Sequence, residues 1–541
     1  MVRYGPGMTI LRVPAIWRRA AGLIAGLLVP ATAAAAPGDF LEPEVTVLHE
    51  LPADAGGGNF GWAVSELGDL DGDGAGEALT AAPFLGEGGE GRVYAFSGRT
   101  GAPLFTWTGE PGDALGYAIA DAGDVDGDGL ADVVAGAPGV SGPGRAYVYA
   151  GADGELLHMF VGTGEAGSFG SAVAGAGDVD GDGLADVLVG AETDPTAGLN
   201  AGRVVVFAGK DFMPIWSREG DAVNAYLGSG TGQLGDVDGD GVPDVVVGAR
   251  GAGADGKGRV AVLSGADGSD LQVHDAAASG GNLGHFFVAG VGDLDGDEVP
   301  EVYGGDYGDS TNGMSSGKAY VWSGQTGALL YEFTGAAAGD GLGCGRRGGD
   351  ADGDGTPDLA IGAYGLDPDG VKGGGRITVY SGATGLPLRT ISGGVEQLQV
   401  GFDVVSVGDV DGDARDDLVL SGAYLNRTFI VAGLAGAEEE TTGGSTGGAP
   451  GETTGAGETT GAGETTGAGE TTGAATSGDS PITTGAGGSS GDAAGSGSSS
   501  DGAAEEPGSG GCGCRSAGQA PWLAVLVLAC ARRRRDSPAR R

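Results

Sequence analysis

Cysteine is scarce in this chain of 541 residues, which contains only 4. Cys344 stands alone in the middle of the sequence, while Cys512, Cys514 and Cys530 all lie near the C-terminus. The central part of the chain therefore has no disulfide framework. If this part is extracellular, we expect a bound cation rather than disulfide bonds to stabilise it, because a ligand that binds only the folded state stabilises that state.

Basic residues are few as well. The chain has 28 Lys and Arg against 74 Asp and Glu, which gives a formal net charge of −46. Binding to nucleic acid requires a basic surface, so this class of partner is excluded. The acidity fits loading with Ca²⁺ and high solubility instead.

Histidine is also rare, and its 4 residues are spread over the sequence as His49, His158, His274 and His285. An enzyme needs a nucleophile–base pair or an open metal site, and no histidine cluster of this kind can be recognised. His285 and Cys344 are predicted to be structural. We therefore predict no catalytic residue and no enzymatic activity.

What the sequence does contain is a motif that recurs seven times, Asp-Val-Asp-Gly-Asp-Gly-Leu-Ala-Asp in the copy that begins at Asp124. Successive copies start 55, 54, 58, 57, 57 and 59 residues apart. A period this regular is typical of a propeller or a solenoid. The other copies begin at Asp69, Asp178, Asp236, Asp293, Asp350 and Asp409.

The spacing of the acids within the motif points to calcium. Carboxylates at positions 1, 3 and 5 of a tight turn converge on one point, and these hard oxygen donors suit Ca²⁺. An EF-hand has its last acid at position 12 and helices on both sides, whereas here the acid stands at position 9 and begins a β-rich run. The alternative is that Asp and Gly simply form good turns, but this does not require an acid at all four positions in every copy. The position-9 acids are Glu77, Asp132, Asp186, Asp244, Glu301, Asp358 and Asp417.

Each repeat contains four short β-rich stretches separated by Gly-rich turns, for example 115–120, 132–137, 144–150 and 156–161. No sustained helical period accompanies them. The pattern predicts an all-β fold, a seven-bladed β-propeller of four-stranded antiparallel blades over residues 40–434. The seventh repeat has only three such stretches, so residues 44–51 are predicted to supply its fourth strand and close the ring. The predicted calcium loops are 69–77, 124–132, 178–186, 236–244, 293–301, 350–358 and 409–417.

The regions outside the propeller have their own compositions. Residues 1–36 combine arginines, an apolar run and a small-residue end, which is typical of a secretory signal peptide. Residues 437–511 consist mainly of Gly, Thr, Glu, Ser and Ala and are predicted to form a disordered stalk, whose Thr-rich tract is a candidate for O-glycosylation. Residues 512–541 hold a Cys motif, a hydrophobic segment and an Arg cluster, and they are predicted to be a processed sorting tail rather than a permanent span.

Two signature elements of the repeat suggest a family. Phe60-Gly61 and Phe169-Gly170 begin the first β-rich stretch of their repeats, and Gly136-Ala137-Pro138 ends a second stretch. The repeats resemble FG-GAP repeats, the units of the integrin α-subunit propeller. The resemblance implies that each loop binds Ca²⁺ through positions 1, 3, 5 and 9 and the backbone carbonyl of position 7, with up to seven ions, one per blade. Glu298 and Ala414 replace the position-6 Gly, which predicts distortion of their loops.

The ligands implied in this way, blade by blade, are Asp69, Asp71, Asp73, Ala75 and Glu77; Asp124, Asp126, Asp128, Leu130 and Asp132; Asp178, Asp180, Asp182, Leu184 and Asp186; Asp236, Asp238, Asp240, Val242 and Asp244; Asp293, Asp295, Asp297, Val299 and Glu301; Asp350, Asp352, Asp354, Thr356 and Asp358; and Asp409, Asp411, Asp413, Arg415 and Asp417.

The C-terminal tail resembles the MYXO-CTERM sorting signal in its Cys motif, hydrophobic segment and Arg cluster. This resemblance implies cleavage near Cys512 or Cys514 by a membrane-embedded sorting protease. The protein is then expected to be secreted and displayed at the cell surface or outer membrane, with contact to the membrane only through the tail.

Three functions fit these features. The first is a surface-anchored, calcium-binding propeller for adhesion or for binding a protein or glycan ligand, with its discrete site on the loops opposite the calcium loops. The second is a secreted hydrolase or lyase acting on polysaccharide or lipid, which requires paired carboxylates outside the repeated motif. The third is a purely structural envelope protein. Candidate carboxylates for the second are Glu110, Asp113 and Glu165.

Two further groups of side chains have a structural and a functional interpretation. Arg346 and Arg347 are predicted to pair with neighbouring loop carboxylates rather than to form a basic spot on the hub. Tryptophans in the repeats are predicted to lie on strands and pack the blades, rather than to form sugar platforms. These tryptophans are Trp62, Trp107, Trp216 and Trp322.

Overall fold

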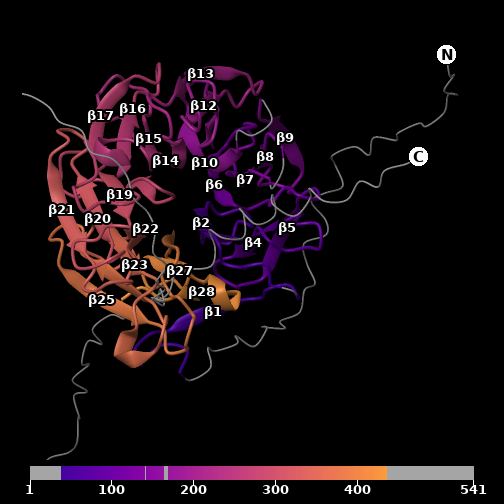
Figure 1. Cartoon of the computed structure of the whole chain (residues 1–541). Coiled ribbons are helices and arrows are strands. Elements are labelled where there is room, and N and C mark those ends of the chain that lie inside the picture. The colour runs from indigo at the N-terminus through magenta and orange to yellow at the C-terminus, as the bar shows by residue number, and fades with distance from the viewer. Residues whose placement is uncertain (1–37, 56, 140–141, 164–167, 435–541) are drawn as a thin grey trace, which may run out of the picture. The chain divides into compact units, whose positions relative to one another are not determined.

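A computed structural model describes residues 38–55, 57–139, 142–163 and 168–434 (Figure 1). Within these residues the secondary structure is 28 short β-strands and three single 3₁₀ turns, η1 (Ala254–Gly256), η2 (Pro368–Gly370) and η3 (Ala423–Leu425). No helix in the described ranges is long and apolar enough to cross a membrane. The predicted signal peptide, stalk and sorting tail lie outside the described residues.

The strands form seven antiparallel four-stranded sheets arranged around a central hub, as predicted (Figure 1). Six sheets each consist of four consecutive strands. The blades are β2 (Val64–Leu67), β3 (Glu77–Ala82), β4 (Arg92–Ser97) and β5 (Pro103–Thr108); β6 (Ala118–Gly123), β7 (Asp132–Ala137), β8 (Arg145–Tyr149) and β9 (Leu156–Val161); β10 (Phe169–Gly177), β11 (Asp186–Ala191), β12 (Arg203–Phe207) and β13 (Pro214–Glu219); β14 (Leu227–Gln233), β15 (Val245–Ala249), β16 (Arg259–Leu263) and β17 (Asp270–Asp275); β18 (Val288–Gly290), β19 (Val302–Asp306), β20 (Lys318–Trp322) and β21 (Leu329–Thr334); and β22 (Leu342–Gly349), β23 (Asp358–Ala363), β24 (Arg376–Tyr380) and β25 (Pro387–Ser392).

The seventh sheet joins the two ends of the propeller. Its order is β1-β28-β27-β26, so the N-terminal strand β1 (Val47–Leu51) supplies the outer strand beside β28 (Arg427–Val431). The pairing runs from Val47 opposite Val431 to Leu51 opposite Thr428. The predicted closing strand is confirmed, although it begins at residue 47 rather than 44. The other two strands are β26 (Val404–Gly408) and β27 (Asp417–Gly422).

The hydrophobic core consists of seven clusters, and each cluster fills the space between two adjacent blades. Trp107 and Trp216 belong to this packing, because each indole N–H donates to a carbonyl of the next blade, Gly154 at 2.9 Å and Gly265 at 2.6 Å. Trp322 stacks on His274 of the preceding blade with ring centroids 4.3 Å apart. These three tryptophans confirm the prediction of blade packing.

The first signature element of the repeat holds neighbouring blades together. The residue before its Gly, such as Leu115, forms an isolated parallel bridge to a Gly before the third strand of the previous blade, here Gly91. At Gly91 φ is +75°, and a Cβ would stand 2.3 Å from the Leu115 carbonyl oxygen. Only glycine fits such a contact. Between the seventh and first blades the connection is made by the side chain of Asn426. Its Oδ1 accepts the N–H groups of Asn59 at 2.8 Å and Phe60 at 3.2 Å.

Candidate metal centres and the hub

Each Asp loop connects the inner strand of a blade to its second strand, so all seven loops lie at the same end of the propeller, here called the loop face. The loop at Asp124, for example, joins β6 to β7. Its position-9 acid, Asp132, is the first residue of β7. In all seven loops the position-9 side chain is 0% exposed.

The short-range hydrogen bonds of the loops are nearly identical. In all seven, position 1 accepts the N–H groups of positions 4 and 6; at Asp124 these donors are Gly127 at 2.7 Å and Gly129 at 2.9 Å. Position 5 accepts the N–H of position 7 in every loop, as Asp128 does from Leu130 at 2.9 Å. These bonds fix the side chains of positions 1 and 5, and they are also the bonds that a simple Asp–Gly turn makes.

The position-9 carboxylate connects the loop to the rest of the blade. Asp132 accepts the N–H of Val125 at 2.8 Å with one oxygen and the N–H of Gly151, in the turn before β9, at 2.9 Å with the other. Glu77, Asp186, Asp244, Asp358 and Asp417 use both oxygens in the same way. Each carboxylate oxygen has a second lone pair, so these bonds leave capacity for a cation.

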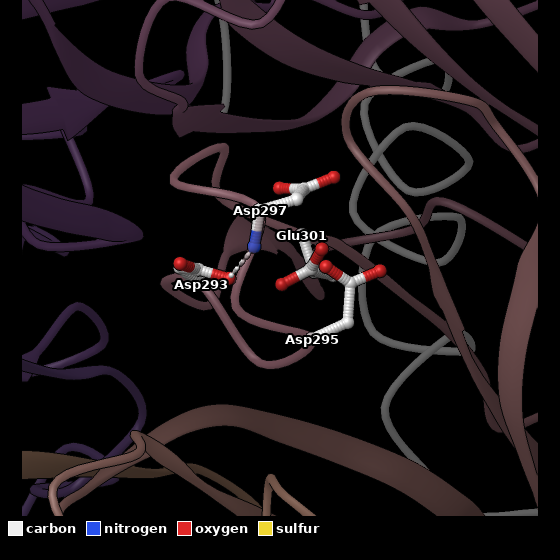
Figure 2. Close-up of side chains that lie close together, drawn as sticks. All are labelled: Asp293, Asp295, Asp297 and Glu301. Carbon is white, nitrogen blue, oxygen red and sulfur yellow. Dashed lines mark hydrogen bonds between the residues drawn. The ribbon is translucent and has the colours of Figure 1, made fainter.

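Several loops bring their acids together. Carboxylate oxygens of positions 1, 3 and 9 lie within 4.8 Å of one another in the loops that begin at Asp69, Asp124, Asp178 and Asp236. The group in the fifth blade also includes the position-5 side chain Asp297 (Figure 2). In two loops the position-5 carboxylate contacts a basic side chain instead, Asp73 with Arg99 at 3.4 Å and Asp182 with Lys210 at 3.3 Å.

The fifth loop differs from the others at its position-9 acid. Glu301 accepts the N–H of Leu294 with Oε2, but its buried Oε1 has no hydrogen-bond partner among the described residues. Figure 2 shows the Glu301 carboxylate beside Asp293, Asp295 and Asp297. A buried carboxylate oxygen without a partner is costly, and four converging carboxylates are the donor set of a hard cation. The residues of this loop therefore fit Ca²⁺.

Burial changes the acidity of the position-9 side chains. It raises the pKa of Asp132 to about 6 and that of Glu301 to about 7, with smaller contributions from the neighbouring carboxylates. The same burial raises the pKa of Glu77 to about 7. A charged carboxylate in this environment is unfavourable unless a positive charge stands next to it.

The expected distortion at Glu298 and Ala414 does not occur. Both residues adopt the left-handed conformation of the glycine that they replace, with φ of 70° and 66° against 90° at Gly129. Both keep the position-6 hydrogen bond, to Asp293 at 2.9 Å and to Asp409 at 2.8 Å. The cost of the missing glycine is backbone strain rather than a different loop shape.

Relief of this strain leads to a testable prediction. Glu298→Gly and Ala414→Gly are each expected to stabilise the protein by up to about 1 kcal/mol, because left-handed backbone is unfavourable for both side chains. Urea unfolding in saturating Ca²⁺ measures the change. Lys257→Gly, at a residue whose φ of −87° is unstrained, is the control for the general cost of glycine and should destabilise the protein slightly. Loop variants that lose as much stability as this control would contradict the strain.

At the opposite end of the propeller, here called the opposite face, the inner strands begin and aromatic rings surround the hub. Trp62 lies 5.2 Å from Phe402 and 5.6 Å from Tyr117 between ring centroids, and Tyr117 lies 5.8 Å from Phe286. Trp62 precedes β2 rather than lying on a strand, so it differs from the three tryptophans that pack the blades. With other inner-strand residues these four rings line the hub cavity, a space of about 540 Å³ including its open mouth.

The two adjacent arginines do form ion pairs, but their partners are on inner strands and their flanks rather than on the Asp loops. Arg346 donates from Nη2 to both Asp403 oxygens at 2.9 Å and to the Val64 carbonyl at 3.1 Å, and thereby links the sixth, seventh and first blades. Arg347 pairs with Glu66 of β2. The predicted pairing with a neighbouring loop carboxylate is therefore confirmed for Arg346, because Asp403 lies in the bend before β26, and it is wrong for Arg347, because Glu66 lies on a strand.

A further set of basic residues was not singled out from the sequence. The third strand of every blade starts with Arg or Lys, and six of the seven pair with a carboxylate within the described residues. Arg427 contacts two carboxylates, Asp39 at 2.7 and 2.9 Å and Glu50 at 2.6 Å. Aligning the seven repeats of the sequence with one another shows that this basic residue recurs at the same position in each. The seven residues are Arg92, Arg145, Arg203, Arg259, Lys318, Arg376 and Arg427.

The other residues considered for catalysis make structural contacts or lie apart from one another in the described part of the chain. Glu110 and Asp113 share the guanidinium of Arg145, and Asp113 also accepts the Tyr147 hydroxyl at 2.5 Å. Glu165 lies outside the described residues. Cys344 is buried with 1% exposure. His49, His158, His274 and His285 lie in separate parts of the propeller: β1, β9, β17 and the segment before β18.

Comparison with known families agrees with the repeat assignment. Residues 124–189 match a family described as FG-GAP-like repeat, and residues 230–263 match one described as FG-GAP repeat. These segments include the loops that begin at Asp124, Asp178 and Asp236. No curated protein matches the chain at a significant level.

Proposed function

We propose that this FG-GAP repeat propeller is a secreted, cell-surface calcium-binding protein that binds a protein or glycan ligand. The repeats and the propeller fold support a ligand-binding scaffold. Calcium, secretion and adhesion are the parts that we add. Secretion and surface display are supported by the compositions of residues 1–36 and 512–541.

The observation that carries the calcium proposal is the fifth loop. Four acidic side chains converge there, and the buried Oε1 of Glu301 lacks a partner in the described part of the chain. Bound Ca²⁺ would supply the missing positive charge and connect the loop to the first residue of the second strand. Repetition of the same acids in all seven blades favours a structural role for the ions.

The two ends of the propeller then have different functions. Calcium would hold the connections between inner and second strands at the loop face. The opposite face, with its variable loops and the aromatic hub cavity, would be free to contact a ligand. A concave aromatic surface with a few polar groups is the usual composition of a binding site.

Binding is expected to depend on calcium even though the ion does not touch the ligand. The full mature chain should bind material from a cell-envelope extract or a glycan array in Ca²⁺, and at least about fivefold more weakly in EGTA, the typical size of coupling between distant sites. The assay is run below the melting temperature of the calcium-free protein, and Ca²⁺ is added back as the control.

Each other outcome favours a different function. Absence of binding in both conditions would favour a purely structural envelope protein. Turnover of a polysaccharide or lipid substrate would favour the hydrolase or lyase. Binding of equal strength with and without Ca²⁺ would contradict the link between the two faces.

A further inference from the structure

Two polar side chains that line the hub cavity have unused hydrogen-bonding capacity. The Oγ1 of Thr231 on β14 and the Nε of Arg346 on β22 are both buried and have no partner within the described residues. Thr231 is 8% exposed. Buried polar groups nearly always have a hydrogen-bond partner, so these two atoms can accept one supplied from solution.

The charges around the cavity select the kind of ligand. A cation would be repelled by the guanidinium of Arg346. An anion would be repelled by the carboxylate of Asp403 and by the net charge of −46. Because Arg346 and Asp403 neutralise each other, a guest without charge is preferred. It has to offer a hydrogen-bond acceptor to Arg346 and a hydroxyl or amide to Thr231.

The walls of the cavity add a second requirement. Trp62, Tyr117, Phe286 and Phe402 surround the polar floor, so the guest also has an apolar face. About 60 Å³ of the space admits water, which is room for a few water molecules or one small group of a ligand. A sugar ring combines an apolar C–H face with hydroxyl donors and acceptors at its edge.

We propose that the hub cavity binds one uncharged sugar residue at its open mouth, with one hydroxyl-bearing edge inserted to contact Thr231 and Arg346 and the C–H face of the ring against the aromatic side chains. This inference rests on the proposed function, because it names the ligand class of the opposite face. It assigns to Trp62 the sugar contact that Trp107, Trp216 and Trp322 do not provide.

The test uses saturation-transfer NMR on the full mature chain in Ca²⁺. The probes are methyl β-glycosides of glucose, galactose and N-acetylglucosamine at millimolar concentration. At least one glycoside is expected to bind. Thr231→Val should weaken its binding by about fivefold, the effect of one lost hydrogen bond. This variant should melt no lower than the parent, because it replaces an unpartnered buried hydroxyl with a methyl group.

Phe402→Leu, which removes one aromatic ring from the cavity wall, should weaken binding of the same glycoside. Thr106→Val, on the exposed outer strand β5, is the matched control and should leave binding unchanged. Failure of all three glycosides to bind, or binding that neither hub variant alters, would overturn the proposal. If the glycosides fail but Phe402→Leu reduces binding to an envelope protein, the ligand is a protein and the proposed function stands. If neither a glycoside nor envelope material binds, the sugar-binding proposal and the proposed function are both contradicted.

Discussion

Asp403→Ala is expected to lower the free energy of unfolding by about 3–5 kcal/mol, because it leaves Arg346, whose side chain is only 23% exposed, without a counter-charge. Asp403 is 4% exposed and also accepts the N–H of Val64 at 3.0 Å. The substitution therefore removes a connection between the sixth, seventh and first blades, where the ring closes. Urea unfolding of the mature chain in saturating Ca²⁺ measures the effect.

The neighbouring arginine provides the matched control. The ion pair of Arg347 with Glu66 has side chains that are 44% and 31% exposed. Exposed ion pairs contribute little to stability, so Arg347→Met is expected to lower the free energy of unfolding by less than about 1 kcal/mol. The double variant Arg346→Met/Asp403→Leu should recover part of the loss, since it leaves no unpaired charge. An equal effect of Asp403→Ala and Arg347→Met would contradict the importance of the hub ion pair.

Glu301→Gln is expected to destabilise the protein in Ca²⁺ but not in EGTA. In Ca²⁺ it should remove one bound ion and its stabilisation, about 2.7 kcal/mol at a free concentration one hundred times the dissociation constant. In EGTA it should leave stability unchanged or raise it, because burial disfavours the charge that it removes and raises the pKa of Glu301 to about 7. Calorimetric melting in both conditions, with a count of bound Ca²⁺, measures both effects.

Glu298→Gln is the control for this experiment, because Glu298 is an exposed residue of the same loop that occupies none of the predicted ligand positions. It should lose no ion and no stability. Destabilisation by Glu301→Gln of the same size in Ca²⁺ and in EGTA would mean that Glu301 acts through packing and hydrogen bonding alone.

Much of the fold could be predicted because the information is local and repeated. The acids of each loop lie within nine residues, and the four β-rich stretches recur in every repeat. The closing strand β1 could be predicted because the seventh repeat lacks its fourth stretch. Glu298 and Ala414 were interpreted less well, because the sequence does not show that a loop held by Asp293 or Asp409 keeps its shape at the cost of left-handed backbone.

The hub could not be predicted in the same way, because it is produced by closure of the ring. Arg346 and Asp403 are 57 residues apart and meet only where their blades become neighbours. Arg346 and Val64 are separated by 282 residues. The unpartnered Oε1 of Glu301 is also invisible in the sequence, where Glu77 occupies the same position with both oxygens bonded.

The central claim, that Ca²⁺ holds the seven Asp loops together, is tested most directly by melting the mature chain in Ca²⁺ and in EGTA while bound metal is counted. We predict several Ca²⁺ ions per chain and a large fall in melting temperature on chelation, because each ion that binds only the folded state adds to stability. Re-addition of Ca²⁺ should restore the original transition. An unchanged melting curve together with no bound Ca²⁺ would contradict the claim and leave the loops as Asp–Gly turns.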